Sequence, residues 1–343
     1  MGSAPDAMPK RGFFGRIAPA LTLAFMAPML AELLPGATRF SAIFVFPIEM
    51  MVWGGGAVMI RELVRRNNLG WANMLALALC LAIAEEWLIQ QTSLAPLVIQ
   101  LKGVEYARGL GINYVYLLWA LVYETVLVVF LPVMLVELLF PSRRDARWLS
   151  TAGWVVHLLL FGLGSFFAWF TWTQIARVKV FHLPAYDPPL AYVAIALGAI
   201  ALLMFLALGP TRRALADLRW RINPIHPAIP ALGGAIWGVL WFGLTVLSFG
   251  IMPSFPPALA MADGIAIALA TIVFGVGFSS HPDWDDRYRA WLLAGTMIAT
   301  MAVFQQAFVG ATPADFWFKT GSFALASVLF IVLVVKVSRR PVA

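Results

Sequence analysis

Apolar residues run through the chain in long, nearly uncharged stretches that are separated by short polar or charged connections. Ten stretches are each about 20 residues long, enough for a helix to cross the ~30 Å hydrocarbon core of a bilayer. They lie near residues 15–35, 41–60, 70–91, 113–139, 150–172, 188–208, 229–250, 258–278, 290–309 and 320–337. The pattern predicts an all-α polytopic membrane protein with about ten transmembrane helices.

Basic residues are concentrated in every second connection. Eighteen of the 24 Lys and Arg residues fall on the side that holds both chain ends in the ten-span scheme. The other six are Arg39, Lys102, Arg108, Arg177, Lys179 and Lys319. Because cytoplasmic loops carry the excess of Lys and Arg, we expect a multi-pass protein of the cell (inner) membrane with both termini in the cytoplasm.

Composition agrees with this class. Hydrophobic residues make up 62% and charged residues 12% of the 343 positions, against about 45–50% and 25% in soluble domains. The polar connections are too short to form a core of their own, so residues 1–343 are expected to form a single transmembrane helical domain. The net charge of +7 is accounted for by the loop clusters, which favours membrane lipids as partners and argues against nucleic acid.

No motif indicates a cofactor or a metal site. The four histidines lie in different segments and lack a paired ligand spacing, and no phosphate-binding loop or dinucleotide fingerprint is present. We therefore predict neither a cofactor nor a metal ion. The single Cys80 lies inside a predicted span, which excludes an intrachain disulfide.

The stretch AIAEEWLIQQ carries two adjacent carboxylates into a predicted span. Glu85 lies ~22 Å along the third span, and Glu124 lies ~16 Å below the outer end of the fourth. Both positions fall in the outer or middle layer of the membrane. Glu49 lies ~12 Å down the second span at a similar level. Ionisable residues inside spans are costly and mark sites or pathways, so we predict an outward-facing polar chamber whose catalytic candidates are Glu85, Glu86 and Glu124.

Six further residues are candidates for a substrate or proton pathway: Glu49, Gln90, Tyr123, His157, Asp263 and Gln305. Gln90 follows Glu86 by four residues and would share its helix face. Two close carboxylates in a low dielectric do not both ionise cheaply, so the Glu85–Glu86 pair is a candidate general base or proton-coupling site. Asp263 and Gln305 also fit an alternative in which they reach the interface.

EEWLIQQ followed by TSLAPL resembles the first signature of the CAAX-protease and bacteriocin-processing (CPBP, Abi) membrane family, a glutamate pair followed by three residues and arginine. The resemblance implies that Glu85 and Glu86 activate water for peptide hydrolysis. Gln90 stands where the family has arginine, and Glu124 stands where its second signature has histidine. The resemblance covers about sixty residues around Glu85 to Glu124.

Three functions remain open on this basis. The first is a CPBP-like intramembrane hydrolase, or a derivative of that scaffold, acting on a small-molecule, peptide or lipid substrate. The second is a proton- or cation-coupled transporter, against which count the lack of an internal repeat and of a second charge cluster towards the inner side. The third is a non-catalytic scaffold or a lipid- or partner-binding protein whose polar groups serve helix association.

Overall fold

The computed structural model describes residues 13–97, 105–217, 226–248, 252–279 and 284–340, and these are mostly helical. Eight helical segments among them are long and apolar enough to cross a membrane: Phe40–Arg66, Trp71–Ile89, Tyr114–Leu139, Thr151–Lys179, Leu190–Leu208, Ala228–Ser248, Asp286–Phe308 and Pro313–Ser338. Two shorter apolar helices, Ile17–Leu33 and Pro257–Val273, occupy the other two predicted stretches. An all-α polytopic membrane protein is thus confirmed, while the count of ten spans stays a prediction.

Several helical segments change along their length from α-helix to a π or 3-10 turn. The first half of the chain contains α1 (Phe13–Pro28), η1 (Met29–Leu33), η2 (Phe40–Val45), α2 (Phe46–Glu49), η3 (Met50–Gly54), α3 (Gly55–Arg66), α4 (Trp71–Ala84), η4 (Glu85–Ile89), β1 (Arg108–Gly109), β2 (Ile112–Asn113), α5 (Tyr114–Tyr123), η5 (Glu124–Phe130), α6 (Leu131–Leu139), η6 (Pro141–Arg143) and α7 (Thr151–Trp169). The second half contains η7 (Phe170–Ala176), α8 (Arg177–Lys179), α9 (Leu190–Leu208), α10 (Arg212–Ala216), α11 (Ala228–Ser248), α12 (Pro257–Ser279), α13 (Asp286–Phe304), η8 (Gln305–Phe308) and α14 (Pro313–Ser338).

Short polar side chains fix where several of these helices begin. Ser150 Oγ accepts the N–H of Gly153 at 3.1 Å at the start of α7. The Asn113 side chain does the same for Tyr116 in α5, at 3.0 Å. Such caps satisfy backbone donors that have no partner inside the helix, so they set the register in which α5 and α7 enter the bundle.

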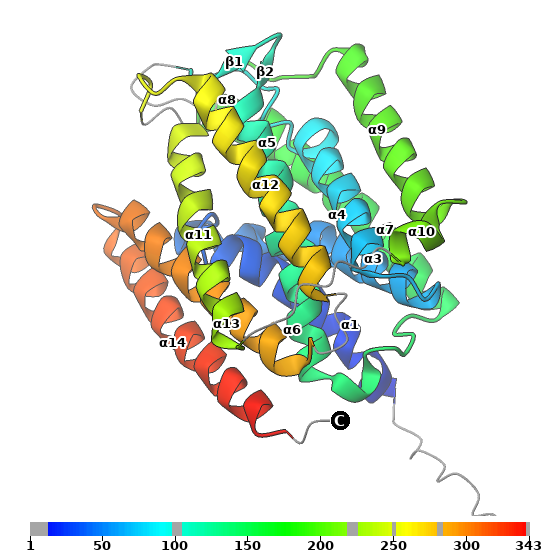
Figure 1. The fold of residues 1–343 in the computed structure, drawn as a ribbon. Coiled ribbons are helices and arrows are strands. Elements are labelled where there is room, and N and C mark those ends of the chain that lie inside the picture. The colour runs from blue at the N-terminus through cyan, green and yellow to red at the C-terminus, as the bar shows by residue number, and fades with distance from the viewer. Residues whose placement is uncertain (1–12, 98–104, 218–225, 249–251, 280–283, 341–343) are drawn as a thin grey trace, which may run out of the picture.

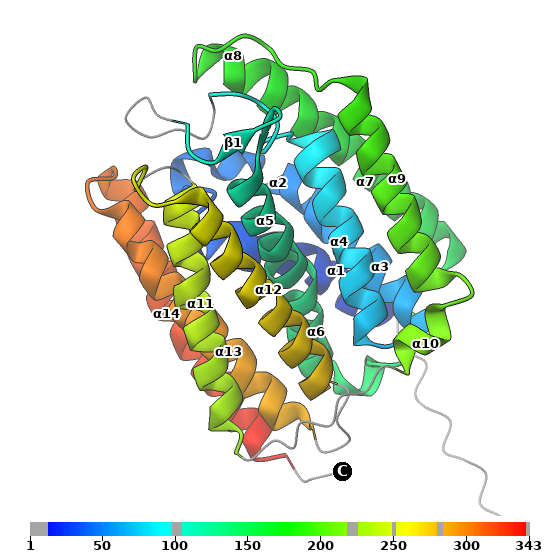
Figure 2. The ribbon, with the colours of Figure 1, turned by 45° about the horizontal axis from the view of Figure 1, so that its top comes forward.

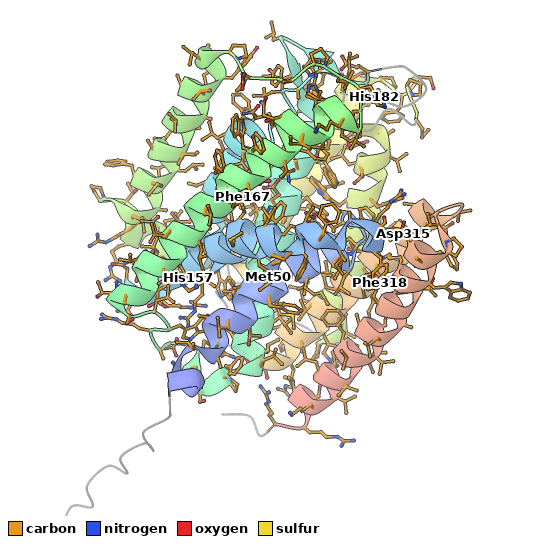
Figure 3. All side chains as sticks on the ribbon, turned by 180° about the vertical axis from the view of Figure 1, so that it is seen from behind. Met50, His157, Phe167, His182, Asp315 and Phe318 are labelled. Carbon is orange, nitrogen blue, oxygen red and sulfur yellow. The ribbon has the colours of Figure 1, made fainter. Side chains whose placement is uncertain are left out.

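The segment made by α5, η5 and α6 lies at the centre of the bundle (Figure 2). In its most apolar stretch of 18 residues, 83% is buried, whereas only 11% is buried in the corresponding stretches of Thr151–Lys179 and Leu190–Leu208. The outer helices therefore present apolar side chains such as Leu159 and Leu190 outwards, which suits contact with lipid tails. The segment Phe40–Arg66 crosses the bundle obliquely to α7, with Met50 near its middle (Figure 3).

Basic side chains lie at both ends of the bundle. Arg143, Arg212 and Arg340 lie at the end that holds the end of α6, α10 and the C-terminal end of α14, and Arg108, Arg177 and Lys179 lie at the other end, with β1, β2 and α8 (Figures 1 and 2). The larger number of Lys and Arg residues that the sequence assigns to the first end favours that end as the cytoplasmic one. The cytoplasmic placement of the termini stays a prediction, and residues 1–12 and 341–343 lie outside the described parts of the chain.

This topology can be tested with reporter fusions in a bacterial host. Green fluorescent protein joined after residue 343 should fluoresce, because it would remain in the cytoplasm. Alkaline phosphatase joined after residue 185 should be active, because its disulfides form only after export, and the same enzyme joined after residue 145 should be inactive. The reverse pattern of phosphatase activity would overturn the orientation.

Candidate functional site

Five glutamates from four helical segments approach one another inside the bundle. They are Glu32, Glu49, Glu85, Glu86 and Glu124, named here the outer carboxylate cluster after the orientation that the sequence predicts. Glu85 interacts electrostatically with Glu86, Glu32 and Glu49. Glu124 interacts with Glu85, Glu86 and Glu32, and Glu32 interacts with Glu49. The structure thus brings together all three catalytic candidates and Glu49, although their roles stay predictions.

Each of these glutamates lies in or beside a π-helical turn. Glu32 lies within η1, Glu49 immediately precedes η3, Glu85 and Glu86 begin η4, and Glu124 begins η5. A π turn is closed by i→i+5 bonds, as between the Gln90 N–H and the Glu85 carbonyl at 2.8 Å. Such turns are rare in proteins and are frequent at functional sites. The backbone therefore departs from regular α-helix at or beside each glutamate of the cluster.

Four of the five glutamates are buried, and Glu32 is half-buried. The exposed fraction of Glu85 is 1%, that of Glu86 is 2%, that of Glu49 is 4% and that of Glu124 is 8%. The ion pairs in the described part of the chain do not include any of these carboxylates. Burying several like charges without a cation is expensive. The arrangement therefore favours the binding of protons or of a positively charged ligand.

Hydrogen bonding differs between the members of the cluster. Glu86 Oε2 accepts the backbone N–H of Ser93 at 3.0 Å, and Glu49 Oε1 accepts a bond from the Thr38 hydroxyl. Both Glu85 oxygens and Glu124 Oε2 are buried without a hydrogen-bond partner in the described residues. Glu85 is thus the carboxylate with the fewest fixed contacts, which suits a group that gains and loses a proton.

Polar contacts outside the cluster hold the turn that carries Glu32. The Lys319 ammonium, itself 1% exposed, donates to the Leu34 carbonyl. Asp315 accepts bonds from Ser41, at 2.9 Å from the backbone N–H and 3.1 Å from the hydroxyl. Figure 3 shows Asp315 at the start of α14, beside the beginning of the oblique segment. The C-terminal helix therefore positions the first two helical segments, and with them Glu32 and Glu49.

Tyr123 also joins the cluster, whereas the other pathway candidates lie apart from it. The Tyr123 hydroxyl donates to the Ala31 carbonyl, and this side chain interacts electrostatically with Glu32, Glu124 and Glu49. Gln90 lines a separate hollow with Trp172 and Arg177, since the η4 turn rotates the residues that follow Glu86 relative to an α-helix.

The remaining three candidates sit on the outer helices. His157 Nδ1 lies 2.9 Å from the Gly153 carbonyl of its own helix. Asp263 is exposed on α12. Gln305 donates to the Thr320 hydroxyl at 3.1 Å. Depth along a helix, the basis on which Asp263 was chosen, does not say which way the side chain turns.

A second charged group lies at the opposite end of the bundle. It consists of Arg61, Glu62, Arg65 and Glu137 and is named here the inner ionic cluster. Glu137 binds Arg65 through two bonds of 2.8 and 2.7 Å and lies 3.5 Å from Arg61 Nε. Glu62 lies 3.4 Å from Arg61. The second charge cluster that the sequence analysis counted as absent is therefore present, at the end of the bundle that is expected to face inwards.

Arg61 is the centre of this inner cluster. Its exposed fraction is 0%. The guanidinium donates to the carbonyls of Ala146, at 2.9 Å, and Arg144, and its carbon lies 3.5 Å from the ring centre of Trp148. These contacts tie α3 to the connection between α6 and α7. Arg61 thus has a structural role. In the sequence analysis it counted only as one of the basic residues that orient the protein in the membrane.

Sequence reasoning also missed Glu32, since a carboxylate at the end of a span is expected to reach the interface. A signal was present in the LPGAT sequence that follows. Gly36 has φ +92°, which glycine adopts readily, and the N–H groups of Gly36 and Thr38 return to the Glu32 carbonyl at 3.0 and 3.1 Å. This tight turn keeps Glu32 inside and places Thr38 between Glu32 and Glu49.

Comparison with known proteins does not assign the protein to a family. No family model matches the sequence, and neither a curated protein nor a solved structure matches it significantly. The arguments for function therefore depend on the chain's own residues. Among the described residues, no group of three or more His, Cys, Asp or Glu side chains is arranged to hold a metal ion.

The same kind of substitution, glutamate to glutamine, is expected to have opposite effects on stability in the two clusters. At alkaline pH, where the carboxylates of the cluster are ionised, Glu85→Gln should raise the thermal unfolding temperature of the detergent-purified protein, because it removes repulsion from the other carboxylates. Glu137→Gln should lower it and cost about 3–5 kcal/mol, because it leaves Arg61 and Arg65 buried without their partner. Arg287→Gln, which breaks a partly exposed pair with Asp285, should change little. A fall with Glu85→Gln as large as that with Glu137→Gln would contradict the assignment of uncompensated charge to Glu85.

Proposed function

We propose that the protein is a proton-coupled transporter of the inner membrane and that the outer carboxylate cluster is its proton-binding site. The observation that carries the proposal is the convergence of five glutamates, four of them buried, with no basic ion-pair partner in the described residues. Carboxylates in a low dielectric are cheaper to bury when they hold protons. Proton uptake and release at such a site can be coupled to the movement of a solute.

The inner ionic cluster supports this proposal. Glu124 and Glu137 lie on the same central segment, 13 residues apart, which corresponds to about 20 Å along a helix. Apolar residues such as Leu127 and Leu131 lie between them and are fully buried. Polar groups at one end and closed ion pairs at the other fit a transporter whose inner end is shut, because alternating access requires one end to be closed at a time.

An intramembrane hydrolase is the second candidate. The specific observation in its favour is the unequal environment of the glutamate pair, in which Ser93 holds Glu86 at 3.0 Å while Glu85 has no hydrogen-bond partner in the described residues. Two carboxyl groups in different environments can divide the roles of acid and base. The resemblance of EEWLIQQ to the CPBP signature points the same way. In this alternative, one carboxylate activates water and the other supplies a proton.

Proton binding can be measured without knowledge of the solute. Infrared spectra of the protein in lipid, recorded across a pH series, should contain the carbonyl band of protonated carboxylic acids at neutral pH. Glu85→Gln and Glu124→Gln should each remove part of this band, because each deletes a member of the cluster. Asp263→Asn, which changes an exposed carboxylate of α12, should leave it unchanged. A wild-type spectrum without the band at neutral pH would overturn the proton-binding assignment.

Transport is tested in proteoliposomes with an imposed pH gradient. A panel of labelled amines, amino acids and organic acids should contain at least one solute that accumulates only while the gradient persists. Glu85→Gln should abolish that accumulation, since it removes the proposed proton carrier, and Asp263→Asn should preserve it. If no solute responds to the gradient, coupled transport of these solute classes is excluded.

The hydrolase alternative predicts new peptide ends in membranes. Membranes from cells that express the wild-type protein should contain N-terminal peptides that are missing from cells expressing Glu86→Gln, because the variant cannot activate water. Quantitative mass spectrometry of membrane fractions makes this comparison, with Asp263→Asn as the matched carboxylate control. Identical sets of peptide ends in all three samples would exclude proteolysis and leave the transporter.

A further inference from the structure

Glu32 differs from the rest of the outer carboxylate cluster in its access to the surroundings. It is half-buried, whereas the other four glutamates are buried. The turn that follows it reaches the surface, because Ala37 and Arg39 are exposed. In the predicted orientation this turn joins the first two spans at their outer end. Glu32 thus lies between the surface turn and the buried carboxylates.

The turn from Glu32 to Thr38 is held in one conformation. The backbone N–H groups of Gly36 and Thr38 both return to the Glu32 carbonyl, at 3.0 and 3.1 Å. A Cβ added at Gly36 would lie 2.6 Å from Phe308 Cζ, so the phenyl ring packs directly against the turn. Thr38 itself is 8% exposed. The position of the Thr38 hydroxyl relative to Glu32 is therefore fixed by the backbone and by the packing around it.

The Thr38 hydroxyl is hydrogen-bonded to two carboxyl groups. It donates to Glu49 Oε1, and the Glu32 side chain forms a second hydrogen bond with it. A hydroxyl has one hydrogen and two acceptor lone pairs, and an ionised carboxylate has no hydrogen to give. Since the Thr38 hydrogen points to Glu49, the bond with Glu32 requires a proton on Glu32. The three groups form a donor–hydroxyl–acceptor chain from Glu32 to Glu49.

The titratable groups that face Glu32 come from the elements packed around it. Those that interact with it electrostatically are all acids: Glu49, Glu85, Tyr116, Tyr123 and Glu124. A proton on Glu32 therefore lowers the repulsion within the cluster. The basic Lys319 of α14 contacts the same turn through the Leu34 carbonyl. It forms no ion pair with a carboxylate in the described part of the chain.

We infer that Glu32 is the entry point for protons into the outer carboxylate cluster and that the Thr38 hydroxyl relays them to Glu49. The inference rests on the proposed proton-binding function of the cluster. In the relay step the Glu32 O–H bond breaks and its hydrogen bonds to the Thr38 oxygen, while the original Thr38 hydrogen passes to Glu49. Thr38 remains a neutral hydroxyl, Glu32 becomes a carboxylate and Glu49 becomes a carboxylic acid. One proton has moved, and Glu32 is free to take up the next one.

Glu85 is the next acceptor on this route. It interacts electrostatically with both Glu32 and Glu49. Both of its oxygens are buried and have no hydrogen-bond partner in the described residues. One oxygen of Glu49, Oε2, is also buried without a partner there. A proton that reaches Glu49 through Thr38 therefore arrives beside the carboxylate with the fewest fixed contacts.

The relay is tested by the rate at which the cluster takes up protons. Full-length protein in lipid nanodiscs is shifted rapidly from alkaline to neutral pH, and time-resolved infrared spectra follow the carbonyl band of protonated carboxylic acids. Thr38→Val removes the hydroxyl and should slow the rise of the band by about a hundredfold, the lower end of what a positioned proton-transfer group contributes. Thr38→Ser keeps the hydroxyl and should keep a rate close to that of the wild type.

Two further variants complete the comparison. Thr245→Val removes another buried hydroxyl, which is 2% exposed and bonds to the Trp241 carbonyl of its own helix at 3.2 Å, and it should leave the rate unchanged. Glu32→Gln keeps Thr38 in place but deletes the entry carboxyl. The band that remains in this variant should rise as slowly as in Thr38→Val, which tests the route even if Thr38→Val does not fold.

The outcomes separate the relay from the proton site. A wild-type rate in Thr38→Val, even with a lower thermal unfolding temperature, would overturn the relay and leave the proposed proton site intact. A rate in Thr38→Ser as slow as in Thr38→Val would also overturn it, because the hydroxyl would not be the cause. A wild-type rate in Glu32→Gln would refute entry through Glu32. A wild-type protein without the band would refute the proton site itself.

Discussion

The cost of placing unpaired carboxylates in an apolar interior is the constraint on which the rest of this structure depends. Glu85, the least contacted of the five glutamates, has two buried oxygens without a hydrogen-bond partner in the described residues. An ordinary packed bundle would relieve this cost by turning such side chains to the interface or by pairing them with Arg or Lys. Here the π turns and the tight Glu32–Thr38 connection hold the carboxylates in place. The surrounding packing must therefore supply the free energy that the cluster consumes.

The inner ionic cluster solves the same electrostatic problem in the opposite way. Glu137 is as buried as Glu85, at 1% exposed, but it is bound by Arg65 and lies near Arg61. Arg61 in turn holds the connection that follows α6 through backbone carbonyls. The inner ionic cluster is thus held by ion pairs, whereas the carboxylates of the outer carboxylate cluster have no ion-pair partner in the described residues. Because both clusters share the central segment, the stable end provides a fixed frame against which the outer end is held.

The sequence predicted the parts of this arrangement that depend on length, hydropathy and depth. Long apolar stretches are enough to locate membrane helices, and helical rise is enough to place Glu49, Glu85 and Glu124 at similar levels. Neither quantity fixes the rotation of a helix about its axis. Asp263 has a suitable depth but is exposed on α12. Glu32 was missed for the complementary reason, since its inward position depends on a turn after the helix and on Lys319, 287 residues further along the chain.

The junction of α5 and η5 connects the central segment with the first helical segment. Tyr123 ends α5, and Glu124 begins η5 directly after it. The Tyr123 hydroxyl donates to the Ala31 carbonyl, in the same π turn that carries Glu32. Glu124 and Glu32 also interact electrostatically. Because the coupling between two binding events is reciprocal, a proton that lowers the cost of burying Glu124 also changes the cost of protonating Glu32, and neighbouring carboxylates of the cluster cannot take up protons independently of one another.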